Sequence, residues 1–272
     1  AEVCRARSVA CVREPVAGLT RARNLGARAA RGELVAYIDD DAIAEPSWLD
    51  GMVREFHDPS VAAVGGRTRY MVADPATLQM TDQEADGEVA PRTHRRFHRT
   101  QSDWFAQACF GGIGDGNTMM FRRALLVSAV RFDERVGRGR PINSGDEHVA
   151  FMSLLADGHT VVRTPAAVVR HPVVVAPGAR RDKRMRDLRS SVAYTLFLFA
   201  ECPRHRLDIV RHFSRRGPMA ASRVTGRASD GLSVVAVACT NTGGALDYFR
   251  ALRQSSAPAT TDAPVPRVVS LR

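Results

Sequence analysis

The most restrictive feature of this sequence is an apolar run that ends in three consecutive aspartates. Residues 33–38, ELVAYI, are mostly apolar with β-branched and aromatic members, as expected for an interior strand of a parallel sheet. Asp39, Asp40 and Asp41 follow directly. Because neighbouring carboxylates repel one another, such a cluster indicates a positive partner. The sequence therefore predicts a buried strand whose carboxyl end holds a cation.

Helix and strand patterns alternate on both sides of this strand. A helix of small residues is predicted over 20–32, an amphipathic helix over 47–58 and an apolar strand over 61–66. A short buried strand is also predicted over 8–14. This alternation is typical of an α/β fold with a mostly parallel, doubly wound sheet flanked by helices.

The rest of the chain divides by composition. Residues 74–103 are polar without a clean period, and we expect one helix and a mobile loop there. An α/β domain is predicted over 1–178, followed by a basic, amphipathic helical appendage over 179–254. The Ala-, Pro- and Thr-rich residues 255–272 are expected to be a disordered tail.

The charge balance leaves several partners open. Lys and Arg exceed Asp and Glu by 10, and nearly all the basic residues are arginine. Nucleic acid, an anionic membrane surface, a phosphate-bearing substrate and the arginine bias of a GC-rich genome would each explain this excess. Aromatic residues make up only 6% and do not alternate with the arginines. We therefore expect no stacking surface for nucleic acid.

The cysteines and the hydropathy of the sequence indicate the cellular compartment in which the protein is expected. The five cysteines are scattered and form no CxxC pair, which argues against a disulfide framework or a zinc site and fits a reducing cytosol. Residues 1–30 contain no apolar core of a secretory signal. The longest apolar stretch, residues 191–200, is shorter than the about 20 residues of a spanning helix. A cytoplasmic protein is expected, with the basic helices at 180–216 as an alternative contact to the inner face of the cell membrane.

The position of the aspartates suggests their chemistry. In open α/β sheets, ligands bind outside the carboxyl ends of the strands. Carboxylates at that place can hold Mg²⁺ or Mn²⁺, and such ions usually also bind substrate phosphates. The alternative is a solvated strand end that caps the following helix.

Four segments in order resemble one enzyme family. GLTRARNLGARAARGELVAYIDDDAIAEPSWL (18–49) looks like the core of family 2 glycosyltransferases with the GT-A fold, in which a G-x-[ST]-x-A-R-N-x-G helix leads to a D-x-D motif. GDGNTMMFRRALL (114–126), GDE (145–147) and RHP (170–172) are similar to later family segments. The resemblance covers roughly residues 8–175. It implies transfer of a sugar, of hexosyltransferase type, from a nucleotide-diphosphate sugar to a hydroxyl acceptor in cell-envelope glycan or glycolipid synthesis.

The resemblance also implies roles on the donor side. Asp41 would bind the metal, Asp39 would reach the metal or the donor ribose, and Asp40 would complete the motif. His171 would be the remaining metal ligand, with a surface histidine as the alternative. Arg23 and Asn24 would lie near the donor nucleotide or brace the D-x-D strand.

The acceptor side needs a base. Inverting sugar transfer requires a carboxylate that takes the acceptor proton. The resemblance gives Glu147 this role, but because the family usually reads E-D where this chain reads Asp146-Glu147, Asp146 stays a candidate. Asp146 could instead cap the helix that starts at Glu147.

One family feature is missing from the sequence. The strand–helix–strand unit that opens the family's domain is absent, so we expect an N-terminally truncated domain and leave open whether this chain is active. The alternative function is an inactive or incomplete GT-A domain that serves as a binding or scaffold module. A phosphatase is disfavoured because Ile43 stands where the D-x-D-x-[TV] motif needs Thr or Val.

Overall fold

The computed structural model describes residues 2–74, 77, 79–89, 93–128, 132–174, 177–215 and 234–254. Its helices are α1 (Glu2–Ala6), α2 (Leu19–Ala29), α3 (Trp48–Val53), α4 (Trp104–Cys109), α5 (Arg123–Ser128), α6 (Asp146–Ala156), α7 (Pro177–Glu201), α8 (Arg206–Arg215) and α10 (Val234–Gln254). Two 3₁₀ turns are η1 (Arg54–His57) and η2 (Pro203–His205). The strands are β1 (Leu34–Ile38), β2 (Ile43–Ala44), β3 (Val61–Ala73), β4 (Met80–Val89), β5 (Arg95–Phe97), β6 (Thr118–Arg122) and β7 (Thr160–Val174).

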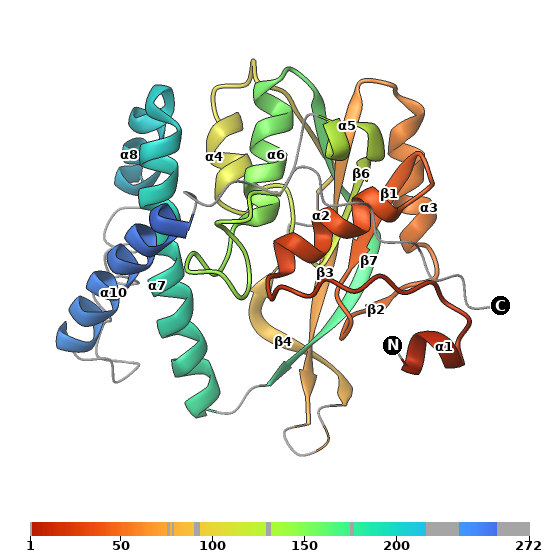
Figure 1. The fold of residues 1–272 in the computed structure, drawn as a ribbon, viewed down its shortest axis with the longest axis horizontal. Coiled ribbons are helices and arrows are strands. Elements are labelled where there is room, and N and C mark those ends of the chain that lie inside the picture. The colour runs from red at the N-terminus through yellow and green to blue at the C-terminus, as the bar shows by residue number, and fades with distance from the viewer. Residues whose placement is uncertain are drawn as a thin grey trace.

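These strands form one mixed sheet with helices on both sides (Figure 1). The central order is β1-β6-β3-β7-β2, with β4 paired to β3 and β5 to β7. Strands β1, β3 and β7 run in one direction, as a mostly parallel sheet predicts. Strand β6 runs antiparallel between β1 and β3, so β3–β7 is the parallel neighbour pair among the described strands. The direction of β6 was not predicted, because an apolar sequence indicates a strand but does not indicate which strands it pairs with.

Alternate residues of the central strands enter two separate cores. On β6, Met119 and Phe121 pack with residues of α2, α4 and α6, whereas Met120 packs against α3 and η1. Both faces of the strand are therefore buried, which explains the continuous apolar sequences of these strands.

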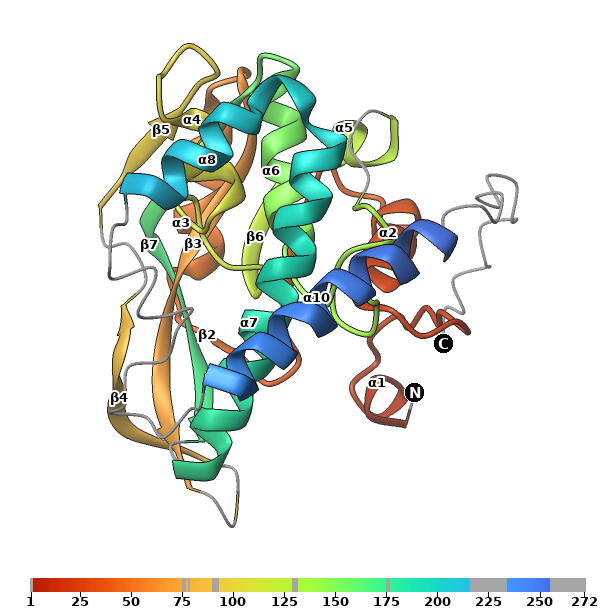
Figure 2. The ribbon, with the colours of Figure 1, turned by 90° about the vertical axis from the view of Figure 1, so that its left-hand side faces the viewer.

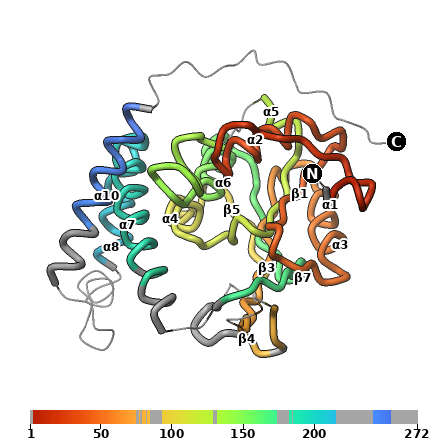
Figure 3. Tube along the Cα trace, turned by 60° about the horizontal axis from the view of Figure 1, so that its bottom comes forward, coloured from red at the N-terminus to blue at the C-terminus, as the bar shows by residue number. Residues whose placement is uncertain are grey.

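Helices α7, α8 and α10 form a layer on one side of the molecule, away from α1 and α3 (Figures 2 and 3). They share the larger core with the sheet, to which they contribute Tyr194, Leu198, Ile209 and Ala251. Residues 216–233 of the predicted appendage and the predicted tail 255–272 lie outside the described residues. None of the helices in the described part combines the length and the apolar character needed to span a membrane.

Two local predictions were wrong. Residues 8–14 form no buried strand, and Val9 is 55% exposed. The helix expected within 74–103 is replaced by β4 and β5, which pair with β3 and β7. Whether these two segments form strands depends on pairing partners far away in the sequence. A local sequence pattern carries no information about such partners.

Candidate functional site

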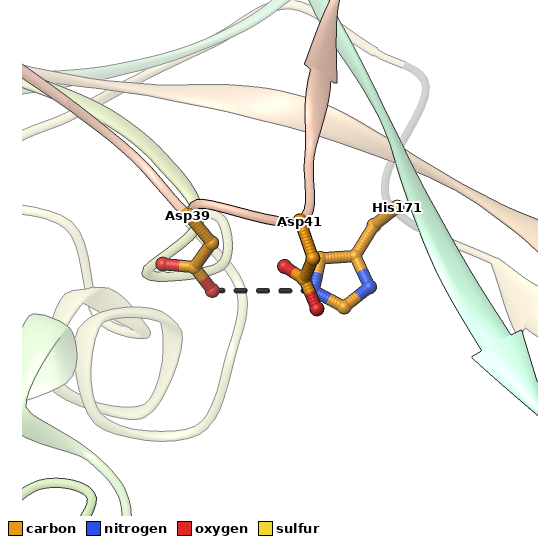
Figure 4. Close-up of side chains that lie close together, drawn as sticks. All are labelled: Asp39, Asp41 and His171. Carbon is orange, nitrogen blue, oxygen red and sulfur yellow. Dashed lines mark ion pairs between the residues drawn. The ribbon is translucent and has the colours of Figure 1, made fainter. Parts of the chain in front are cut away.

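Asp39, Asp41 and His171 lie together at the end of β1 (Figure 4). One potential ligand atom from each residue lies within 4.8 Å of the others. The short strand β2 follows the aspartates and pairs with β7 at Ile43 and Arg170, which places the aspartate turn beside His171. Three residues predicted as metal ligands are thus brought together by strand pairing.

The hydrogen bonds of His171 suit a metal ligand. Its Nδ1 lies 3.0 Å from the carbonyl oxygen of Pro172. Since a carbonyl can only accept, Nδ1 is the donor in this contact, and in a neutral imidazole this arrangement leaves the lone pair of Nε2 available to a metal. That Nε2 lies 3.2 Å from Asp41 Oδ1 and 4.0 Å from Asp39 Oδ2. Two carboxylates and an imidazole nitrogen form a donor set that fits a divalent cation such as Mn²⁺.

The middle aspartate is placed differently. Asp40 is exposed, and its carboxylate does not belong to the group formed by Asp39, Asp41 and His171 in the described part of the chain. Asp40 therefore does not have the position of a metal ligand, and it provides a matched control for the removal of a neighbouring carboxylate.

Arg23 connects this group to the second predicted constellation. The side chain projects from α2 and is 6% exposed. It forms a buried ion pair with Asp146, donates from Nη2 to the carbonyl oxygen of Gly116 over 2.7 Å, and lies 3.6 Å from Asp39 Oδ1. A buried guanidinium needs such partners because an unpaired charge is costly inside a protein.

Asn24 has a local structural role. Its Nδ2 donates to the carbonyl oxygen of Phe132 over 2.9 Å, and its Oδ1 accepts from the Phe132 amide over 3.0 Å. Both amide atoms therefore brace the loop before α6. The predicted alternative, in which Asn24 braces the D-x-D strand, is replaced by this contact.

Asp146 and Glu147 begin helix α6. The N-cap is Gly145, with a φ of 97° and no side-chain cap bond, so the alternative in which Asp146 caps the helix is not observed. Asp146 instead pairs with Arg23. A Cβ placed on Gly116 would lie 3.4 Å from Glu147 Cδ and 3.1 Å from Arg23 Nη2. The two carboxylates and the guanidinium thus share one compact site.

Burial changes the proton affinities of these groups. Burial first, and then the Glu147 charge, raise the pKa of Asp146 to about 6, against the lowering effect of Arg23. Burial also raises the pKa of Glu147, and Arg23 again acts in the opposite direction. Carboxylates with a raised pKa in a polar cluster are suited to proton transfer near neutral pH.

Asp115 and Tyr70 also lie at this site, although neither was predicted from the sequence. Tyr70 donates its hydroxyl to Asp115 Oδ2 over 2.7 Å, and its ring packs edge-on against His171. Burial lowers the pKa of His148, and the Asp115 charge opposes this; burial raises the pKa of Glu147, and the Asp115 charge adds to it. Asp115 could have been noticed in the sequence because it lies between Gly114 and Gly116. Glycines have no side chains to shield the acidic group between them.

Comparisons with known proteins decide the family. Residues 2–127 match the model of glycosyl transferase family 2. These residues belong to this family. Membership, together with the helix-flanked sheet, confirms the predicted α/β, GT-A-like class.

The relatives of this chain include a glucosyl-dolichyl phosphate glucuronosyltransferase of Haloferax volcanii, 44% identical over 142 residues that cover 48% of the chain and 38% of the relative. An N-acetylglucosaminyltransferase of Sinorhizobium fredii is 25% identical over 68% of the chain and 43% of its own length. The chain thus spans about two fifths of the length of these relatives.

A solved structure is also similar. The crystal structure of GalNAc-T7 with UDP, GalNAc and Mn²⁺ shares 13% identity and a TM-score of 0.41, over 58% of the chain and 31% of that structure.

The ion pair between Arg23 and Asp146 makes a direct prediction about stability. Arg23→Met leaves Asp146 buried without its partner and should lower the free energy of unfolding by about 3 kcal/mol in urea denaturation. Adding Asp146→Asn should recover part of this loss, because position 146 then carries no buried charge without a partner. Strictly additive effects of the two changes would show that the pair is not coupled.

Proposed function

We propose that the chain is an inverting, metal-dependent glycosyltransferase that moves a sugar from a nucleotide-diphosphate sugar to a hydroxyl acceptor. One observation carries this proposal. Arg23 contacts Asp39 of the metal-ligand group and Asp146 of the carboxylate pair, so a donor site and a candidate base lie on either side of one side chain. The names of the two relatives, both sugar transferases, support the same reaction class.

On the donor side, Asp39, Asp41 and His171 would hold Mg²⁺ or Mn²⁺ together with the donor diphosphate. A bound ion of this kind neutralises negative charge on the departing nucleoside diphosphate. The chain itself supplies the ordered imidazole of His171, oriented by the Pro172 carbonyl. Arg23 adds a fixed positive charge 3.6 Å from Asp39.

On the acceptor side, a carboxylate takes the proton of the acceptor hydroxyl. The acceptor oxygen then forms a bond to the anomeric carbon while the bond from that carbon to the diphosphate oxygen breaks. The electron pair of that bond leaves with the nucleoside diphosphate, and the configuration at the anomeric carbon inverts.

Glu147 suits the base role better than Asp146. One oxygen of Asp146 is engaged by Arg23, which stabilises its charged form. Glu147 lies beside Gly116, where a Cβ would approach its carboxyl carbon to 3.4 Å, and its Oε1 lies 3.6 Å from His148 Nε2. A glycine at position 116 leaves room for an acceptor next to this carboxylate.

A glycolipid or a cell-envelope glycan is the proposed acceptor class. The Haloferax relative is named for a dolichyl phosphate, which is a lipid carrier. Helix α8 supports a peripheral membrane contact, because Leu207 and Val210 are 67% and 55% exposed beside the exposed Arg206 and Arg211. Apolar side chains flanked by arginines complement an anionic lipid surface. We place this contact at the inner face of the cell membrane.

Donor binding can be tested by calorimetric titration of UDP and GDP, with and without Mn²⁺. We expect one of the two to bind in a metal-dependent manner, and Asp41→Ala to abolish this binding because it removes a carboxylate ligand. Asp40→Ala should retain metal-dependent binding, because Asp40 lies outside the metal-ligand group. A well-folded wild type that binds neither nucleotide would favour the alternative of an incomplete domain that acts as a binding or scaffold module.

The base is tested by the rate at which the nucleoside diphosphate is released. Glu147→Gln should lower kcat by about 10²-fold or more, and Asp146→Asn should lower it less. Because burial raises the pKa of Glu147, the rate should begin to fall with decreasing pH above the ordinary glutamate value of 4.5. The reverse order of the two variants would give the base role to Asp146.

Membrane contact is tested by flotation with phosphatidylglycerol and phosphatidylcholine vesicles. The chain should bind only the anionic vesicles, and the double variant Leu207→Ser/Val210→Ser should weaken this binding by about tenfold. Val16→Ser, which changes an exposed valine before α2, serves as the control. Equal binding by both variants would contradict a contact through α8.

A further inference from the structure

Helix α7 contacts the turn at the start of α6. The hydroxyls of Ser190 and Ser144 lie 2.7 Å apart. One helical turn further along α7, the ring of Tyr194 packs against Gly145 and lies 6.0 Å, centroid to centroid, from the ring of His148. The residues that α7 contacts therefore lie on both sides of Asp146 and Glu147 in the sequence: Ser144 and Gly145 before them, and His148 after them.

The contact with Gly145 is close and specific. Gly145 has a φ of 97°, a conformation that favours glycine. A Cβ at this position would lie only 2.6 to 3.0 Å from atoms of the Tyr194 ring. The ring thus occupies the space that a side chain would otherwise take, and it fixes the point at which α6 begins.

Helix α7 is itself firmly held. Ser190 is buried, and so are Ala193 and Leu198 on the same helix. Arg189 donates from Nη2 to Asp247 of α10 over 2.9 Å. Gly244 of α10 packs directly on α7, because a Cβ there would lie 2.5 Å from the Arg189 carbonyl oxygen. Helix α7 can therefore act as a rigid support for the turn it contacts.

We propose that Ser190 and Tyr194 are positioning residues of the reaction, which hold the Ser144–Gly145 turn and through it the carboxylates of Asp146 and Glu147. This inference rests on the proposed glycosyl transfer. It assigns a part in catalysis to α7, which lies beyond residues 2–127 that match the family. Because a displacement of a reacting group by about 1 Å can cost about 100-fold in rate, a loosened turn should affect the chemical step.

The experiment compares donor binding with turnover in the full chain. Binding of UDP and GDP with Mn²⁺ is measured by calorimetry, and turnover is measured as release of nucleoside diphosphate from the nucleotide sugar that the wild type uses fastest. Ser190→Ala and Tyr194→Leu should lower kcat by about 10- to 100-fold, with the KM for the donor and the nucleotide Kd within about twofold. Tyr194→Phe keeps the ring and should retain wild-type turnover.

Thr195→Ala is the matched control, since Thr195 is half-buried on the same helix and its hydroxyl donates to the Ser191 carbonyl over 2.7 Å. Unchanged kcat in Ser190→Ala and Tyr194→Leu would overturn the proposal. A parallel loss of kcat, nucleotide binding and melting temperature would overturn it as well, because it would show a general structural role. A wild type without nucleotide binding would instead remove the proposed function, and this inference with it.

Discussion

The site depends on one buried positive charge. Arg23 lies inside the protein with Asp146, Asp39 and the Gly116 carbonyl around it. These partners come from α6, the turn after β1 and the glycine-rich loop before β6. A buried guanidinium that loses its partners is strongly unfavourable, so the energetic need to satisfy Arg23 also fixes the relative positions of the three segments.

The sequence predicted the segments whose local pattern is strong. Three features have the predicted positions: strand β1, helix α3 and the aspartates at the end of β1. All three could be predicted because apolar content and an acidic cluster are local signals. The resemblance placed His171 beside the aspartates, although no periodicity could do so. Its position follows from the pairing of β2 with β7, two segments far apart in the chain.

The errors have a common physical origin. Residues 8–14 are apolar enough for a strand but form none and lie exposed or half-buried, whereas the polar segment at 80–89 forms β4 along β3. In both cases the presence or absence of a neighbouring strand to pair with determines whether the segment forms a strand. Likewise, Asp146 is a residue type that often caps helices, but here its carboxylate pairs with Arg23, and α6 has no side-chain cap bond. Long-range partners therefore decided what the local pattern left open.

The spacing of the metal-ligand group along the chain has a thermodynamic consequence. Asp39 and Asp41 follow β1, and His171 is on β7, so an unfolded chain does not hold the three ligand atoms together. A cation that binds this group binds the folded state in preference to the unfolded one. By mass action, such a ligand at a hundredfold excess over its Kd stabilises the fold by about 2.7 kcal/mol. Occupancy of the donor site and resistance to unfolding are thus linked quantities in this protein.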